Sequence, residues 1–454
     1  MKRFNKSLNF AIAFAMIASL VAACSSGGGT ENGGTSADST GAAPAEGTKL
    51  EMTTEPITLK FMSALWSDES FKEFIQDEVT AKFPNITMEL ISEDEGLTQA
   101  GIEKSLSKGL VPDIIQAHTG YEIIKDFDMD YPLDDLIKAN KYDLGKFQDG
   151  LIDIYKARDP YGKGKLYGIP YENVATALYY NKSIFDKFGV AYPKDGMTWD
   201  QVIELAKRVT GERDGVKYRG LMFESWWHYT FALSQLSANG TDPATGEPQF
   251  SKNPAFAKFF DLIKQMVSIP GNWEKGMKEN FANQQAAMQL NHLSKLSEFN
   301  KKEGFNFDVV SFPVWPDVPN TAPTKFIGWT LGISKQSKYK QEAFKVIEFL
   351  TSPEVQERNA RKGKASPLKD PNIMEHFAAD KIGDKKYNVK GAISLKPPKA
   401  PVYSRFGPDI QMNGSDYVGK KANEFITSTD DVSTFLRKMD DDYATIVKEM
   451  QNKK

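Results

Sequence analysis

The sequence predicts an α/β protein made of two lobes. The chain has 454 residues, whereas a single hydrophobic core stops growing at about 250 to 300 residues. Stretches with strand periodicity alternate with stretches of helix periodicity, which is typical of sheets with parallel strands. A comparable alternation starts again after Gly168, so we expect a second lobe of the same class.

The first alternation begins with ITLKFMS, whose apolar side chains alternate from Ile57 onward as in a strand. A helix capped by Ser67 follows and ends at Pro84. The strand ITMELI, a helix closed by Gly109 and a short strand around Ile114 complete a β-α-β-α-β order. This order predicts a parallel sheet with right-handed crossovers, in which ligands bind beyond the carboxyl ends of the strands. The residues that follow those ends are Trp66, His118 and Tyr121.

The second alternation contains clear helix boundaries. ATALYYN reads as a strand, and the helix in NKSIFDKFGV has Gly189 after its last turn. TWDQVIELAKRVTG predicts a helix opened by a capping box of Thr198 and Gln201. RGLMF, NFDVVSF and GWTLGIS read as strands, QQAAMQLN passes from helix into strand, and EAFKVIEFL predicts a helix. The last predicted helix carries apolar residues at spacings of three and four: Leu436, Met439, Tyr443, Ile446, Val447 and Met450.

Composition excludes several classes of function. The net charge is -3 and the Lys and Arg residues are spread through the chain, so no basic patch indicates a nucleic-acid partner. One cysteine permits no internal disulfide or zinc cluster, and the four histidines lack the spacing of metal ligands. We therefore expect no structural metal and no cofactor, and we expect a monomer.

The N-terminus predicts export and attachment to a membrane. Basic residues precede an apolar run from Leu8 to Ala23, which matches a secretory signal and is shorter than a spanning helix. Val21-Ala22-Ala23-Cys24 resembles the lipobox of bacterial lipoproteins, in which Cys24 would carry the lipid. A conventional signal with an incidental cysteine is the alternative. We assign residues 1–23 to the signal peptide and 24–55 to a disordered Gly/Ser-rich tether.

Four stretches, taken in chain order, are similar to one known family. They are PDIIQAH; GIPYENVATALYYNKSIFDKFGV followed by TWDQVIELAKRVTG; FANQQAAMQL; and FPVWPD followed by GWTLGISKQSKYKQEAFKVIEFLTSPEVQ. Through them nearly the whole mature chain resembles family 1 of the extracellular solute-binding proteins, the lipoprotein receptors of bacterial ABC importers.

The resemblance implies a two-lobed periplasmic-binding-protein-like fold of type II, with a ligand cleft between lobes that close like a hinge. It assigns residues 56–167 and 302–365 to the first lobe, and residues 168–301 and 366–454 to the second. Most relatives take sugars, so it implies a carbohydrate ligand, in the first place an oligosaccharide, and the transmembrane subunits of an ABC permease as partners. The long polar stretch after Gly363 departs from the family pattern, so the resemblance does not define the third crossover or one wall of the cleft.

Sugar recognition suggests which residues form the site. A sugar ring has apolar C–H faces and hydroxyl groups at its rim, so a receptor needs flat aromatic rings and directional polar groups. The tryptophans at predicted element ends fit the first need, although packing in the core is a competing interpretation for each. Glu172 fits the second or is a surface carboxylate, and Arg405 also fits a salt bridge within the long polar stretch. The predicted ligand-binding residues are Trp66, His118, Tyr121, Glu172, Trp226, Trp227, Asn291, Trp329, Tyr403 and Arg405.

Two other functions fit the sequence less well. A secreted glycoside hydrolase or lyase needs a carboxylate pair in a diagnostic context, and neither that nor a G-x-S-x-G or H-E-x-x-H motif is present, so we expect no enzyme activity. An importer receptor for a peptide, polyol or phosphodiester is the other alternative. Several tryptophans and few clustered Arg and Lys residues favour a sugar over an anion.

Overall fold

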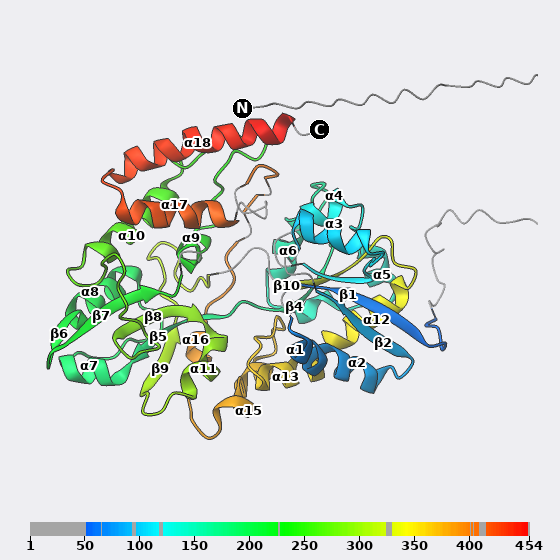
Figure 1. Cartoon of the computed structure of the whole chain (residues 1–454), viewed down its shortest axis with the longest axis horizontal. Helices are drawn as coiled ribbons and strands as arrows, with labels where there is room; N and C mark the ends of the chain where they lie inside the picture. The colour runs from blue at the N-terminus through cyan, green and yellow to red at the C-terminus, as the bar shows by residue number, and fades with distance from the viewer. Residues whose placement is uncertain are drawn as a thin grey trace, which may run out of the picture. The chain divides into compact units, whose positions relative to one another are not determined.

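Two five-stranded sheets organise the fold (Figure 1). The computed structural model describes residues 51–64, 66–92, 97–117, 121–225, 228–323, 329–399, 401–402, 404–407 and 415–452. The first sheet has the order β2-β1-β3-β10-β4, with β1 Ile57–Met62, β2 Ile86–Ile91, β3 Ile114–Ala117, β4 Ile169–Glu172 and β10 Trp329–Ile333. The second has the order β6-β7-β8-β5-β9, with β5 Thr176–Asn181, β6 Gly211–Arg213, β7 Val216–Phe223, β8 Ala286–His292 and β9 Phe307–Ser311.

Both sheets are mixed, which corrects the prediction of a parallel sheet. β1 runs parallel to β2 and β3, as expected from the βαβ pattern. β10 is antiparallel to both of its neighbours, β3 and β4, because it enters the first sheet on the chain's return from the second. In the second sheet β7 and β8 are parallel, whereas β5 is antiparallel to β8 and β9.

The helices around the first sheet begin and end largely where local signals predict. Ser67 accepts a hydrogen bond from the Ser70 N–H and opens α1, and the helical run ends at Lys82, before Pro84. These helices are α1 Asp68–Phe71, the π-helix η1 Lys72–Gln76, α2 Asp77–Lys82, α3 Gln99–Ser107, α4 Glu122–Asp126, α5 Asp134–Ala139, the 3-10 helix η2 Leu144–Lys146, α6 Leu151–Lys156, α12 Lys340–Leu350 and α13 Pro353–Arg361.

The second set of helices includes two predicted caps. The capping box of Thr198 and Gln201 opens α8, and Gly189 ends α7 with φ 63°, a left-handed conformation that favours glycine. QQAAMQLN differs from the prediction because its first residues form a turn rather than a helix. The helices are α7 Lys182–Phe188, α8 Trp199–Val209, α9 Thr230–Ser234, α10 Pro254–Ser268, η4 Leu293–Lys295, α11 Leu296–Asn300, α17 Ser415–Thr427 and α18 Val432–Asn452.

Strand pairing moves the predicted lobe boundaries. β4 (residues 169–172) pairs in the first sheet and β9 (residues 307–311) in the second, so the boundaries at 167/168 and 301/302 are each wrong by one strand. The turns at these positions connect elements within a lobe. The chain instead passes between the sheets at residues 173–175, after β4, and again between β9 and β10.

The long polar stretch after Gly363 contacts residues of both lobes. Its three short helices are α14 Pro371–Glu375, α15 Ala379–Ile382 and α16 Val389–Ala392. Near its start the Lys369 N–H donates to the Lys146 carbonyl at 3.0 Å. Further on, the Tyr387 ring stacks on Phe307 of β9, with centroids 4.8 Å apart. The boundary at 366 assigned these residues to the second lobe alone. The contacts show instead that residues 366–397 pack against both lobes.

Buried side chains form three clusters. One packs α3 and α4 on the first sheet through Met62, Ile102 and Ile124. The second packs α8, α10, α17 and α18 on the second sheet and includes the apolar stripe predicted for the last helix, with Leu436 and Tyr443 buried. The largest continues from the first sheet and α12 to the other face of the second sheet. Within the part of the chain that the structure describes, no helix is both long and apolar enough to cross a membrane.

Candidate functional site

One edge of the first sheet collects the ends of four strands. β1 and β3 are parallel, so their carboxyl ends share an edge, and β10 begins at that edge because it runs antiparallel to β3. β4 ends there with Glu172 opposite Trp329. The predicted residues Trp66, Tyr121, Glu172 and Trp329 therefore come from the same edge.

The matching edge of the second sheet connects directly to the first. β7 and β8 end there, and β5 begins there with Thr176 opposite His292. Residues 173–175 alone separate β4 from β5. The chain's second passage also joins these edges, because β9 ends beside the start of β5. Ligand sites in α/β proteins lie beyond such carboxyl ends, so the two edges delimit the candidate site.

A lysine that the sequence analysis missed lies at the centre of the first edge. The Lys364 ammonium is 2.8 Å from a carboxylate oxygen of Glu172. It also lies 4.3 Å from the ring centroid of Trp66 and 5.6 Å from that of Trp329. Lys364, Phe74, Glu172, Trp66 and Trp329 are called the lysine cluster below.

Burial sets the electrostatics of this cluster. The side chains of Glu172 and Lys364 are 8% and 21% exposed. Burial raises the pKa of the Glu172 carboxyl above its ordinary value of 4.5, and the neighbouring Lys364 ammonium offsets part of the rise. The pair carries no net charge when both groups are ionised.

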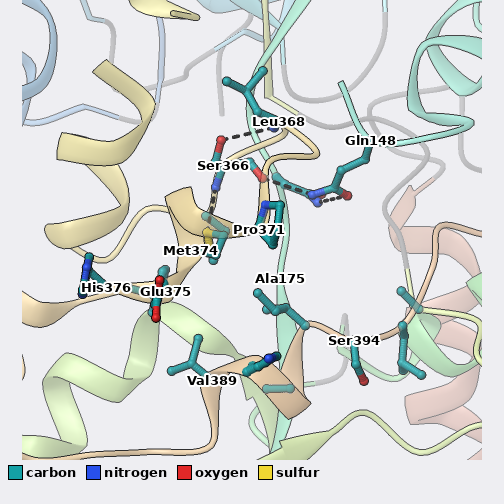
Figure 2. Close-up of a pocket in the computed structure, with 18 of the residues that line it drawn as sticks. Gln148, Ala175, Ser366, Leu368, Pro371, Met374, Glu375, His376, Val389 and Ser394 are labelled. Carbon is teal, nitrogen blue, oxygen red and sulfur yellow. Dashed lines mark hydrogen bonds between the residues drawn. The ribbon is translucent and has the colours of Figure 1, made fainter. Parts of the chain in front are cut away.

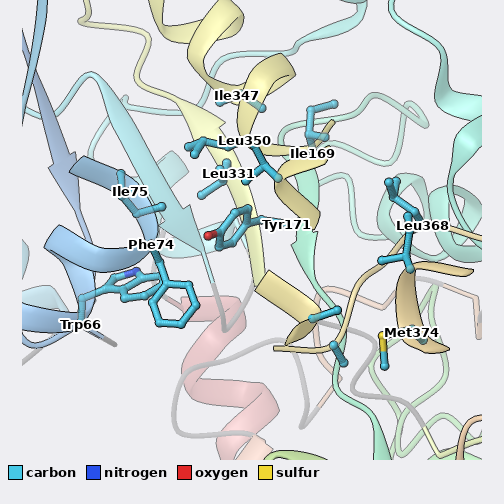
Figure 3. Close-up of a cluster of buried hydrophobic side chains, with 14 of the residues drawn as sticks. Trp66, Phe74, Ile75, Ile169, Tyr171, Leu331, Ile347, Leu350, Leu368 and Met374 are labelled. Atoms are coloured by element: carbon cyan, nitrogen blue, oxygen red, sulfur yellow. The ribbon is translucent and has the colours of Figure 1, made fainter. Parts of the chain in front are cut away.

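Trp66 is packed more tightly than an open sugar platform would be. It is 7% exposed and its indole N–H donates to the Gln116 side-chain oxygen. Its ring lies 5.8 Å from Phe74 and 6.4 Å from Tyr171, centroid to centroid, and Figure 3 shows it at one end of the buried cluster that continues to Leu331 and Leu350. Trp329 is half-buried and is the more exposed residue of the two.

Tyr121 is also held inside the protein. It is 4% exposed, and its hydroxyl shares a 2.8 Å hydrogen bond with the Thr330 hydroxyl. A Cβ on Gly168 would lie 2.6 Å from both hydroxyl oxygens, so this close approach requires glycine. Burial raises the pKa of the Tyr121 hydroxyl above its ordinary value of 10.0.

Asn291 lies near the second edge, where it pairs with Ala177 of β5. Asn291 is fully buried, and its side-chain oxygen accepts from the His292 N–H at 2.7 Å. Its side-chain nitrogen has no hydrogen-bond partner among the described residues. Arg405 is exposed, and its guanidinium lies 4.5 Å from the ring centroid of Phe406. His118, Trp226, Trp227, Tyr403 and the predicted lipid carrier Cys24 lie outside the described residues.

A cavity of about 1030 Å³ borders the first passage between the sheets (Figure 2). Its walls come from residues 148–149, 173–176, 322–323 and the stretch 365–397. Gln148 ties two walls together, since its side chain accepts from the Asn173 amide at 3.0 Å and donates to the Ser366 carbonyl at 3.2 Å. Of the predicted site residues that the structure describes, none lines this cavity.

No sequence signal could have identified Lys364 or Phe74 as site residues. Lys364 stands in the basic stretch RKGK, which resembles a solvated surface. Phe74 stands at helical spacing with other apolar residues in SDESFKEFIQDEVTAKF, a pattern typical of core packing, and it is 7% exposed. Among the described residues, no group of three or more His, Cys, Asp or Glu side chains has the arrangement of a metal site.

Comparison with known proteins shows the family. The model of the bacterial extracellular solute-binding protein family matches residues 66–357, more than half of the chain. The sn-glycerol-3-phosphate-binding periplasmic protein UgpB of Agrobacterium fabrum is 25% identical over 244 residues, which cover 50% of this chain and 54% of the relative. The chain thus spans about half the length of the curated relatives it matches.

Solved structures agree in fold. The sugar-binding protein MalE of Xanthomonas citri superposes with a TM-score of 0.66 at 18% identity, covering 88% of this chain and 100% of that one. UgpB of Mycobacterium tuberculosis in complex with glycerophosphocholine superposes with a TM-score of 0.65 at 16% identity, covering 87% and 99%. The two-lobed α/β fold is therefore confirmed. The chain belongs to the bacterial extracellular solute-binding protein family.

Proposed function

We propose that this protein is the extracytoplasmic receptor of an ABC importer and that it binds a neutral carbohydrate. Among carbohydrates, an oligosaccharide is the preferred candidate. The observation that carries the proposal is the pair of strand edges joined by residues 173–175, with Glu172 and Trp329 side by side at the first edge. A solute held between the edges contacts both sheets, so it favours the closed arrangement of the lobes by population shift.

The chemistry of the first edge supports a neutral polyhydroxyl ligand. The half-buried Trp329 offers a flat apolar ring, and the Glu172 carboxylate accepts hydrogen bonds from hydroxyl groups. Lys364 neutralises that carboxylate at 2.8 Å, so this edge has no excess positive charge for a phosphate. The competing candidate is a phosphate-bearing solute, because the relative from Agrobacterium fabrum is a glycerol-3-phosphate-binding protein.

One panel of ligands tests both candidates. Thermal unfolding is followed with mono- and oligosaccharides, sn-glycerol 3-phosphate and glycerophosphocholine, because a ligand that binds only the native state raises the melting temperature. We expect a saccharide to raise it and the phosphate compounds to leave it unchanged. A shift with the phosphate compounds alone would reject the carbohydrate proposal.

Trp329→Ala provides the site-specific arm of this experiment. It should reduce the saccharide-induced shift, because the variant loses the ring on which the sugar face packs. Trp273→Ala is the matched control, since Trp273 is also half-buried but lies in the turn region after α10. If both variants lose the saccharide-induced shift equally, the ligand does not bind specifically at the first edge.

A further inference from the structure

Lys364 places its ammonium inside a cage of aromatic rings. The ammonium nitrogen lies 4.3 Å from the ring centroid of Trp66, 4.9 Å from that of Phe74 and 5.6 Å from that of Trp329. All three distances are within the ~6 Å at which a cation is attracted to a ring face. The Glu172 carboxylate closes the cage at 2.8 Å.

The same arrangement of groups is how proteins recognise alkylated ammonium ligands. Aromatic rings around a cation, with a carboxylate nearby, form the cages that bind choline-like groups. Trp66, Phe74 and Glu172 are each 7% exposed, so these walls are preformed and shielded from water. The occupant in this protein is one of its own side chains.

We propose that Lys364 is a specificity-determining residue, which fills a cation cage of Trp66, Phe74, Trp329 and Glu172 and thereby excludes cationic solutes from the site. The cage would otherwise select a small alkylammonium group. With Lys364 in place, the edge presents hydroxyl-bonding groups and no net charge. Only this last consequence rests on the proposed carbohydrate function.

Removing the lysine side chain should make the cage available to a cation from solution. Lys364→Ala leaves a buried carboxylate without its cation, which is destabilising, and leaves a space bordered by aromatic rings. A small ammonium ion from solution can enter that space and restore both the ion pair and the ring contacts. A sodium ion is strongly hydrated and gains little from the rings, so it should not substitute.

The experiment is chemical rescue of Lys364→Ala. Its melting temperature is measured in methylammonium, n-butylammonium or tetramethylammonium chloride against sodium chloride at equal ionic strength and pH 7. We expect a lowered melting temperature that rises saturably with the alkylammonium ions, with no such rise in the unsubstituted protein. Tryptophan fluorescence should likewise saturate with tetramethylammonium only in the variant.

Two further variants make the result specific. Lys362→Ala is the matched control, because the Lys362 ammonium lies 5.1 Å from the Phe74 ring but pairs, at 3.5 Å, with Glu73, whose side chain is 41% exposed. It should show no rescue. The double variant Glu172→Gln with Lys364→Ala should lose most of the rescue, since the carboxylate that attracts the cation is gone.

The outcomes separate this proposal from the carbohydrate proposal. Rescue of Lys362→Ala to the same extent, or no rescue of Lys364→Ala, would overturn the cage. If Lys364→Ala does not fold in sodium chloride, refolding it in alkylammonium salts should yield soluble protein, and failure of that refolding is also a negative result. The saccharide panel uses the unsubstituted protein, so either proposal can fail while the other stands.

Discussion

Glu172 is a buried acidic residue of the candidate site. It ends β4, its side chain is 8% exposed, and Lys364 is its partner. Because burial raises its pKa from 4.5, the folded protein holds a proton at this site more firmly than the unfolded chain. Its contribution to stability is therefore complete below pH 4.5 and is lost as pH rises through the folded-state pKa.

Glu172→Gln tests this linkage. The amide does not titrate, so the free energy of unfolding of the unsubstituted protein minus that of the variant should fall as pH rises above 4.5 and then level off. Each unit of pKa elevation corresponds to about 1.4 kcal/mol. Urea unfolding between pH 4 and pH 8 measures the difference, and a difference that grows with pH would contradict the raised pKa.

At the scale of single elements, α8 shows why local signals were sufficient. The Thr198 hydroxyl accepts from the Gln201 N–H, and the Gln201 side chain accepts from the Thr198 N–H at 2.9 Å. The helix buries its apolar stripe, including Trp199 and Val202, in the second cluster. The capping box and the spacing of the apolar residues both lie within this one segment, so the sequence alone indicated the helix.

Thr198→Ala should remove the cap and lower the free energy of unfolding by about 1 kcal/mol. Thr427→Ala is a suitable control, because its hydroxyl donates to the Glu424 carbonyl inside the last turn of α17 and caps no N-terminus. We expect a change within about 0.5 kcal/mol for the control. Equal losses in denaturant unfolding would mean that the capping box contributes nothing specific.

Sheet membership and the site could be predicted only in part, because both depend on residues far apart in the chain. Periodicity located β9 and β10 but not the short β4, and the pairing of β9 with β5 and of β10 with β4 is long-range and leaves no local mark. The same holds for Lys364, whose neighbours Trp66 and Trp329 come from distant segments. β10 and β4 place Trp329 opposite Glu172, and the role of these two residues in ligand binding stays a prediction.

For the whole molecule, the N-terminal segment predicts attachment to the membrane surface. Cys24→Ala should move the protein from the membrane fraction to the soluble fraction after export, because the thiol that would carry the lipid is absent. The saccharide-induced rise in melting temperature should not change. Retention of the variant in the membrane fraction, measured by immunoblotting, would reject Cys24 as the anchor.

The position of β10 in the chain also affects the order in which the two sheets can be completed. β10 lies between β3 and β4, yet the chain emerges with β4 first, then the five strands of the second sheet, and only then β10. The first sheet therefore cannot be completed before β10 has been synthesised, whereas all strands of the second sheet precede β10 in the chain. In a chain truncated before β10, one edge of β3 and both edges of β4 would lack a partner strand and would be open to other chains and to proteases.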